Sequence, residues 1–222
     1  MIQEQKEKNI LLSSLLMPTI FLVVIWSVKI LETVFNTSFA FLGIYPLEWE
    51  GIPGIILAPF IHSDFSHLSA NSIPLFVLMA TLFYFYRKIA LKIFILIFLF
   101  TNIWVWISAR EAYHIGASGI VYGLASFLFI SGLIRKNPRL MAISLMVAFL
   151  YGSLIWGLFP ELFPEENISW ESHLWGLVAG AVLAIYFRKQ GPQRKLYSWD
   201  LEEEEEEEED YENAYWKTRT RS

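Results

Sequence analysis

The sequence predicts an all-α membrane protein, a bundle of six transmembrane helices. Hydrophobic residues make up 55% of the 222 positions and the mean hydropathy is +0.43, which is too apolar for a water-soluble domain of this length. Six stretches come close to the roughly 20 apolar residues that cross a hydrocarbon core of about 30 Å. Because backbone groups find no water partners in lipid, each stretch is expected to be a helix.

The six segments follow one another along most of the chain: Ile10–Ile30, Leu68–Tyr86, Ile89–Ile107, Ser118–Ile134, Leu140–Phe159 and Trp170–Phe187. Lys6 and Lys8 precede the first segment, as they do in a signal peptide. Its apolar run is long, however, and no Ala-x-Ala cleavage pattern follows. The first segment is therefore predicted to be a retained signal anchor.

Basic residues mark alternate ends of these segments and set the orientation. They lie before the first, between the second and third, between the fourth and fifth, and after the sixth: Lys6, Lys8, Arg87, Lys88, Arg135, Lys136, Arg139, Arg188, Lys189, Arg194 and Lys195. The other connections are acidic, with Arg110 as their clear base. The positive-inside rule then predicts that both termini are cytoplasmic. Lys29, near the outer end of the first segment, is expected to extend outward to water.

The predicted organisation has three parts. Residues 1–9 form a cytoplasmic N-terminus, residues 10–190 form the six-helix membrane domain, and residues 191–222 form an acidic cytoplasmic tail. Asp200, Glu202–Glu209, Asp210 and Glu212 supply 11 of the 22 acidic residues, and such a run repels itself and is expected to be disordered. The absence of cysteine excludes disulfides, thiolate metal sites and cysteine nucleophiles.

Three polar residues from different segments reach a similar depth in the predicted bundle. Counted from the cytoplasmic boundary at 1.5 Å per residue, Ser118 lies about 25 Å up, Asn71 about 24 Å and His173 about 22 Å. A serine needs an adjacent base to act as a nucleophile, and a neutral histidine can accept its proton. We therefore predict a catalytic Ser118–His173 dyad. Glu171 is not expected to reach inward as a third member.

Nearby residues are expected to support this pair. Tyr122, one turn after Ser118, is predicted to pack against the His173 ring. The Ser118 backbone N–H, the Asn71 amide and the His67 imidazole are candidate donors to the oxyanion that forms in acyl transfer.

Glycines explain how the two helices can meet. They follow both predicted catalytic residues at four-residue spacing: Gly119, Gly123, Gly176 and Gly180. Such faces allow the close backbone approach that a serine–histidine hydrogen bond of about 2.6–3.2 Å requires. Gly116 and Gly119 also flank the predicted nucleophile directly.

The sequence offers no pattern for a metal, a cofactor or a nucleic acid. It has no His-Glu-x-x-His and no phosphate-binding glycine loop. His62 and His67 have no acid or third histidine at ligand spacing to complete a metal site.

Taken together, three motifs resemble those of the rhomboid family of intramembrane serine proteases: His62-x4-His67-x3-Asn71, Gly116-Ala117-Ser118-Gly119 with Tyr122, and His173-x2-Gly176-x3-Gly180. The resemblance covers about residues 10–190. It implies a rhomboid-like six-helix architecture, a Ser118–His173 dyad, and His67 and Asn71 around the oxyanion. It also implies cleavage of transmembrane protein substrates near small residues. Many members carry Trp-Arg in the first loop, whereas here Trp49 is followed by Glu50.

The sequence therefore predicts an intramembrane serine endopeptidase in a bacterial plasma membrane, acting on transmembrane proteins in the lipid bilayer. A non-catalytic protein that binds transmembrane helices, as a chaperone or trafficking factor, is the alternative, and a six-helix transporter is a more distant one. Intact Ser118 and His173 favour the protease, and the lack of internal repeats counts against the transporter. Substrate entry is predicted beside the fifth segment, where Trp156 is either part of a lateral gate or an interfacial anchor.

Overall fold

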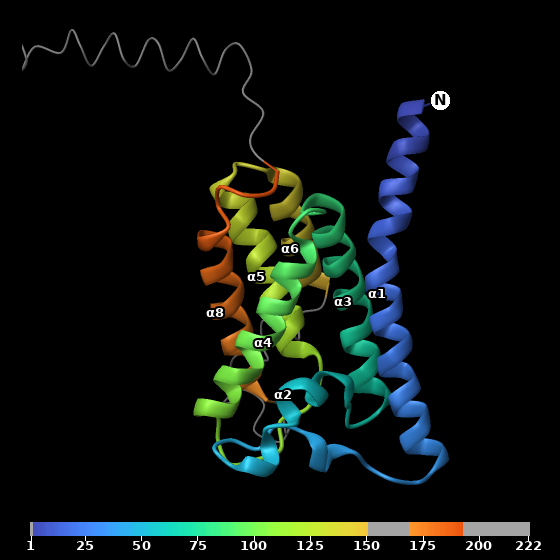
Figure 1. The fold of residues 1–222 in the computed structure, drawn as a ribbon, viewed down its shortest axis with the longest axis vertical. Helices are drawn as coiled ribbons and strands as arrows, with labels where there is room; N and C mark the ends of the chain where they lie inside the picture. Colours follow the sequence, from blue (N-terminus) through green and yellow to red (C-terminus); the bar gives the residue numbers. More distant parts are fainter. Residues whose placement is uncertain (1, 151–168, 193–222) are drawn as a thin grey trace, which may run out of the picture. The chain divides into compact units, whose positions relative to one another are not determined.

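The computed structural model describes residues 2–150 and 169–192. Within these ranges every named element is helical (Figure 1), and the β-type contact is an isolated antiparallel bridge between Ile44 and His114. The α-helices are α1 (Ile2–Val34), α2 (Gly54–Leu57), α3 (Phe65–Phe85), α4 (Ala90–Ser108), α5 (Ser118–Ile134), α6 (Pro138–Leu150) and α8 (Trp170–Tyr186). Three short 3₁₀ turns lie with α2 between α1 and α3: Ala40–Leu42, Trp49–Gly51 and Ala58–Phe60.

Each predicted apolar segment overlaps one of these helices, so the all-helical class is confirmed. Within residues 2–150 and 169–192, three helices are long and apolar enough to cross a membrane: Gln3–Val34, Phe65–Phe85 and Ala90–Ser108. Helix α5 is apolar but has 17 residues, so the count of six spans stays a prediction. The end of the fifth predicted segment, including the proposed gate at Trp156, lies outside the described residues, as does the acidic run of the tail.

Helix α1 begins earlier than predicted because polar side chains extend its first turns. Gln3 donates to Glu7 at 3.3 Å and Gln5 donates to Asn9 at 3.2 Å, each across one helical turn. Pairs at this spacing stabilise a helix by a few tenths of a kcal/mol each.

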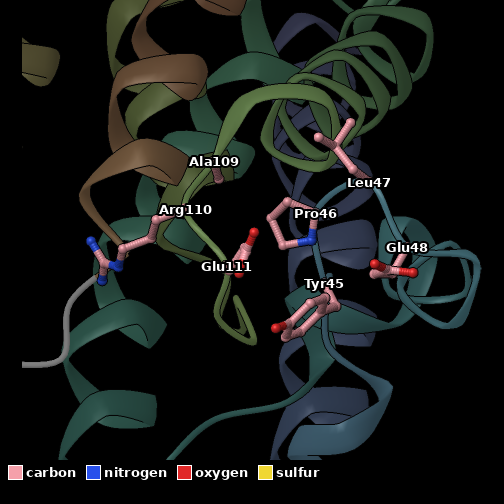
Figure 2. A pocket seen from close by; sticks show the side chains of 7 residues that line it. All are labelled: Tyr45, Pro46, Leu47, Glu48, Ala109, Arg110 and Glu111. Carbon is pink, nitrogen blue, oxygen red and sulfur yellow. The ribbon is translucent and has the colours of Figure 1, made fainter.

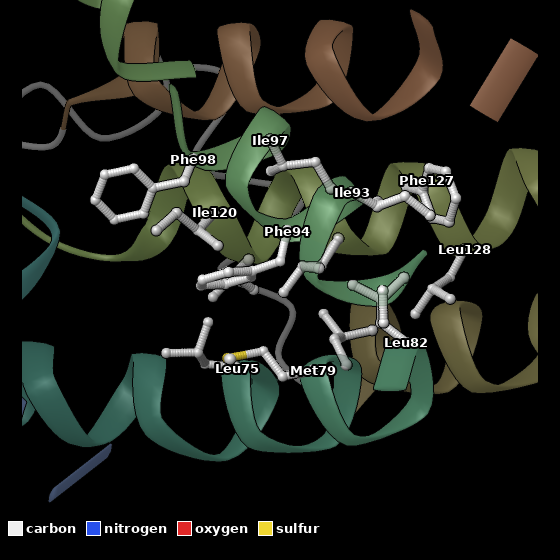
Figure 3. Packing of buried hydrophobic residues seen from close by; sticks show 14 of the residues in the cluster. Leu75, Met79, Leu82, Ile93, Phe94, Ile97, Phe98, Ile120, Phe127 and Leu128 are labelled. Atoms are coloured by element: carbon white, nitrogen blue, oxygen red, sulfur yellow. The ribbon is translucent and has the colours of Figure 1, made fainter. Parts of the chain in front are cut away.

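One apolar cluster joins the helices that carry the candidate site (Figure 3). Leu75 and Met79 of α3, Ile93 and Phe94 of α4, and Phe127 of α5 are all buried in it. Close packing in such a core leaves little room for a helix to shift. The cluster therefore holds the helix of Asn71 and the helix of Ser118 in one rigid arrangement.

Helices α5 and α8 form the most extensive helix pair in the described part of the chain. A Cβ on Gly176 would overlap the Gly119 carbonyl oxygen, and one on Gly180 would overlap the Gly123 carbonyl oxygen. These four glycines, which we call the glycine seam, let the two backbones touch as predicted.

The opposite end of the same helix pair is joined by Arg135, which follows the last residue of α5. Its buried guanidinium donates to the carbonyl oxygens of Phe187 and Gln190 at 2.7 and 2.6 Å. It also donates to Ser131 and lies 5.5 Å from the Tyr86 ring centroid. These carbonyls lie just beyond the end of α8, where cations are favourable. The α5–α8 pair is thus fixed at both ends.

The connection between α1 and α3 is packed against α4. Asn102 donates to the Ile55 carbonyl at 2.9 Å, and Trp106 donates to the Glu48 carbonyl at 3.1 Å. Asn102 therefore satisfies a backbone group of this connection, which explains a polar side chain buried in an apolar helix.

The glycine seam makes a specific prediction about stability. We expect Gly176→Ala to lower the free energy of unfolding by roughly 2 kcal/mol, because overpacking against a backbone carbonyl outweighs the gain of about 1 kcal/mol in helix propensity. Val182→Ala on the same helix is the control, since Val182 is 47% exposed. Thermal unfolding in detergent measures both, and equal stability of the two variants would contradict the close contact.

Candidate active site

Ser118 and His173 are in hydrogen-bond contact in the structure. His173 Nε2 lies 2.9 Å from Ser118 Oγ, which joins the first residue of α5 to the first turn of α8. When a neutral His173 carries its hydrogen on Nδ1, the Ser118 hydroxyl donates to Nε2. His173 is buried, whereas Ser118 is half-buried.

Tyr122 stacks on the His173 ring, as the sequence predicts. The ring centroids are 4.2 Å apart and the planes differ by 12°. Tyr122 lies one turn after Ser118 on the same helix. Helix α5 therefore supplies both the Ser118 hydroxyl that contacts the His173 imidazole and the Tyr122 ring that stacks on it. This arrangement restricts the tilt of the His173 ring.

Gly116 shapes the turn that leads into Ser118. Its φ of +104° lies in the region that side chains rarely adopt, and a Cβ there would come within 2.8 Å of His67 Cε1. Both constraints require glycine at this position. The turn therefore brings the His67 ring against the backbone just before Ser118.

The start of α3 places His67 and Asn71 at the same end of the bundle. Asp64 caps the helix by accepting the His67 N–H at 2.8 Å, and this hydrogen bond is the main cause that lowers the pKa of Asp64. Asn71 is buried and donates one of its two amide hydrogens to the His67 carbonyl at 3.1 Å. His67 Nδ1 lies 3.2 Å from Ser63 Oγ.

His62 is a site residue that the sequence reasoning did not single out, although it begins the motif that contains His67. It is 2% exposed, and its Nε2 accepts the Ala117 N–H at 3.4 Å, one residue before Ser118. Burial, followed by the charge of His67, lowers the pKa of His62 to about 3. His62 therefore stays neutral near pH 7 and keeps this acceptor for the turn before Ser118.

Lys29 secures the backbone around His62. Its ammonium donates to the carbonyl oxygens of His62 and Ser63 at 3.1 and 2.9 Å and pairs with Glu32 at 3.1 Å. Lys29 thus uses three donors on protein groups and its side chain is only 13% exposed, so the predicted extension of this side chain into water is wrong. Glu32 is itself buried and accepts the Phe39 N–H at 2.6 Å.

Glu171, which is not expected to reach inward as a third member of the dyad, is nevertheless a buried residue. Glu171 is only 4% exposed, because Arg110 in the α4–α5 connection pairs with both of its oxygens at 3.2 Å. Helical spacing places Glu171 in the first turn of α8 but does not identify a partner 61 residues away. Its carboxylate is engaged by Arg110, on the loop that leads to Ser118.

A pocket of about 480 Å³ lies between two loops (Figure 2). It is lined by Tyr45, Pro46, Leu47, Glu48, Ala109, Arg110 and Glu111. Neither Ser118 nor His173 lines this pocket, so it is separate from the candidate active site. Among the residues that the structure describes, no three histidine, cysteine or acidic side chains are grouped to hold a metal ion.

The buried neutral His62 predicts a dependence of stability on pH. Below pH 6.5 the unfolded chain binds a proton at this histidine and the folded chain does not, so stability falls as the pH falls toward 3, by up to about 1.4 kcal/mol per pH unit. We expect the unfolding temperature to drop less between pH 7 and pH 5 in His62→Gln than in the wild type. Burial also lowers the pKa of His114, so part of the slope should remain. Identical slopes in the two proteins would contradict the assignment.

Comparison with known proteins identifies the family of this chain. The rhomboid domain family matches residues 49–190, which include Ser118 and His173. An uncharacterized protein of Mycobacterium bovis is 34% identical over 79% of this chain and 75% of its own length, and one of Mycobacterium leprae is 31% identical over 79% and 71%. A Bacillus subtilis protein named "Putative rhomboid protease YdcA" is 29% identical over 65% of this chain and 70% of its own. The chain is an integral membrane protein and belongs to the rhomboid family of intramembrane proteases.

Proposed function

We propose that the chain is an intramembrane serine endopeptidase that cleaves transmembrane or membrane-proximal segments of protein substrates. Ser118 is the nucleophile and His173 is its general base. The observation that carries this proposal is the 2.9 Å contact between His173 Nε2 and Ser118 Oγ in a chain of the rhomboid family. A protein that only binds transmembrane helices does not need a serine hydroxyl in hydrogen-bond contact with a histidine.

In the proposed reaction, Ser118 Oγ attacks the scissile carbonyl carbon while His173 Nε2 takes the hydroxyl proton. The tetrahedral intermediate then collapses, the peptide C–N bond breaks, and His173 gives the proton to the leaving amine. Water attacks the resulting ester with His173 again as base, which releases the acid and restores Ser118. Tyr122 keeps the imidazole oriented through both half-reactions by stacking on it.

The negative oxygen of the intermediate is proposed to accept hydrogen bonds from three donors. The Ser118 N–H lies at the start of α5, where the first backbone N–H groups have no partner within the helix. Asn71 has a second amide hydrogen besides the one given to the His67 carbonyl. His67 is the third proposed donor, since its ring lies against Gly116 in the turn before Ser118. In this structure Ser63 donates its hydroxyl hydrogen to Asp64 at 2.8 Å, so donation from His67 Nε2 requires that hydroxyl to turn to His67 Nδ1 when the oxyanion forms.

The proposed setting is a bacterial plasma membrane with both termini in the cytoplasm. Exposed cations gather at the ends of helices remote from Ser118: Arg87, Lys88, Lys136, Arg188 and Lys189. The positive-inside rule assigns that end to the cytoplasm, and the relatives from Mycobacterium and Bacillus are bacterial. Residues 1–9, 10–190 and 191–222 are then the N-terminus, the catalytic membrane domain and the acidic tail.

If Ser118 and His173 form a catalytic dyad, replacing either residue should abolish cleavage. Purified Ser118→Ala and His173→Ala proteins should fail to cleave a model transmembrane substrate, and the double variant should be little worse than either, because the two residues act as a unit. Ser126→Ala is the control, since it removes another serine hydroxyl from α5, one that bonds the Leu177 carbonyl. Robust turnover by the Ser118→Ala protein would rule out this nucleophile.

The proposed oxyanion donors predict a different kinetic effect. Asn71→Ala should lower kcat by roughly 10²–10³, the usual loss for one such donor, while KM changes little. Ser72→Ala, at the position next to Asn71, is the control. It removes a hydroxyl that accepts the Trp26 indole N–H, and it should keep the kcat of the wild type. A change confined to KM would make Asn71 a substrate-binding or structural residue instead.

A further inference from the structure

A second group of polar side chains joins the loop before Ser118 to the start of α8. His114 Nε2 lies 3.0 Å from the Arg110 carbonyl oxygen, and His114 Nδ1 lies 2.6 Å from Ser169 Oγ. A carbonyl only accepts, so Nε2 carries the hydrogen and a neutral His114 accepts the Ser169 hydroxyl at Nδ1. Ser172 Oγ, 2.7 Å from Ser169 Oγ, then donates to Ser169. His114 is buried, so water does not compete for these hydrogen bonds.

The ion pair between Arg110 and Glu171 holds the same loop to the same helical turn. Both Glu171 oxygens lie 3.2 Å from Arg110 Nη1, and the Arg110 backbone N–H donates to one of them at 3.4 Å. A buried carboxylate is costly unless it is paired, so this contact favours the first turn of α8 lying against the loop of Arg110. We call Arg110, His114, Ser169 and Glu171 the outer latch.

The outer latch lies directly beside the dyad. Glu171 comes two residues before His173, and His114 comes four residues before Ser118. The loop from Arg110 to Ser118 therefore touches the start of α8 at its beginning, in its middle and at its end. Ser169, which precedes α8, makes no side-chain cap on its own helix and bonds His114 instead.

We propose that Glu171, held by Arg110, is a positioning residue that sets the distance between His173 and Ser118. This inference rests on the proposed function. A displacement of about 1 Å in a catalytic pair can cost roughly 100-fold in rate. The glycine seam holds α5 and α8 together independently, so loosening the latch should move the imidazole without separating the helices.

Glu171→Gln keeps the shape of the side chain and removes its charge. We expect kcat for a transmembrane substrate to fall roughly 10- to 100-fold, with KM within about twofold, because the misplaced group acts on the chemical step. Glu50→Gln is the matched control, because Glu50 is an exposed carboxylate in another loop and has no ion pair among the described residues. Its kcat should equal that of the wild type.

A second variant separates positioning from folding. Arg110→Met/Glu171→Met replaces the ion pair by apolar side chains, which often preserves stability. The inference predicts a wild-type unfolding temperature with kcat still low. Recovery of kcat together with stability would overturn it, as would a wild-type kcat in Glu171→Gln. A wild-type protein that cleaves nothing would instead contradict the proposed function and, with it, this inference.

Discussion

At the glycine seam the backbones of α5 and α8 meet without any side chain between them, since a Cβ on Gly176 would overlap the Gly119 carbonyl oxygen. Each helix carries its candidate catalytic residue just beyond this contact: Ser118 precedes Gly119, and His173 lies one turn before Gly176. The 2.9 Å contact between the two side chains is a consequence of that closeness. Side-chain chemistry at this end of the bundle therefore depends on backbone packing below it.

The polar groups around the pair follow from the apolar surroundings. Buried polar atoms need hydrogen-bond partners, and here the partners include backbone groups and a serine hydroxyl of the segments that enter the site. His62 accepts the N–H of Ala117, and His114 spans the Arg110 carbonyl and Ser169. Burial lowers the pKa of both histidines, so near neutral pH each keeps a nitrogen that accepts a hydrogen bond. These contacts hold in place the turns next to Ser118 and His173.

Much of the site was predictable because helices convert position in sequence into depth. The basic residues at the ends of the segments mark the cytoplasmic boundary. Counting 1.5 Å per residue from that boundary places Ser118 and His173 at a similar depth. The stacking of Tyr122 follows from its place one turn after Ser118. The burial of Glu171 did not follow, because its partner Arg110 lies in a loop whose path has no periodic signal. His62 was visible in its motif, but only the folded structure shows that its ring accepts the Ala117 N–H.

Covalent labelling tests most directly whether His173 activates Ser118 at the end of the glycine seam. A fluorophosphonate probe reacts with an activated serine hydroxyl, and peptide mass spectrometry identifies the residue that carries the adduct. We expect an adduct on Ser118 in the wild-type protein in lipid nanodiscs, and its loss in folded His173→Ala protein. An adduct on a different serine, or undiminished labelling of Ser118 without His173, would contradict it.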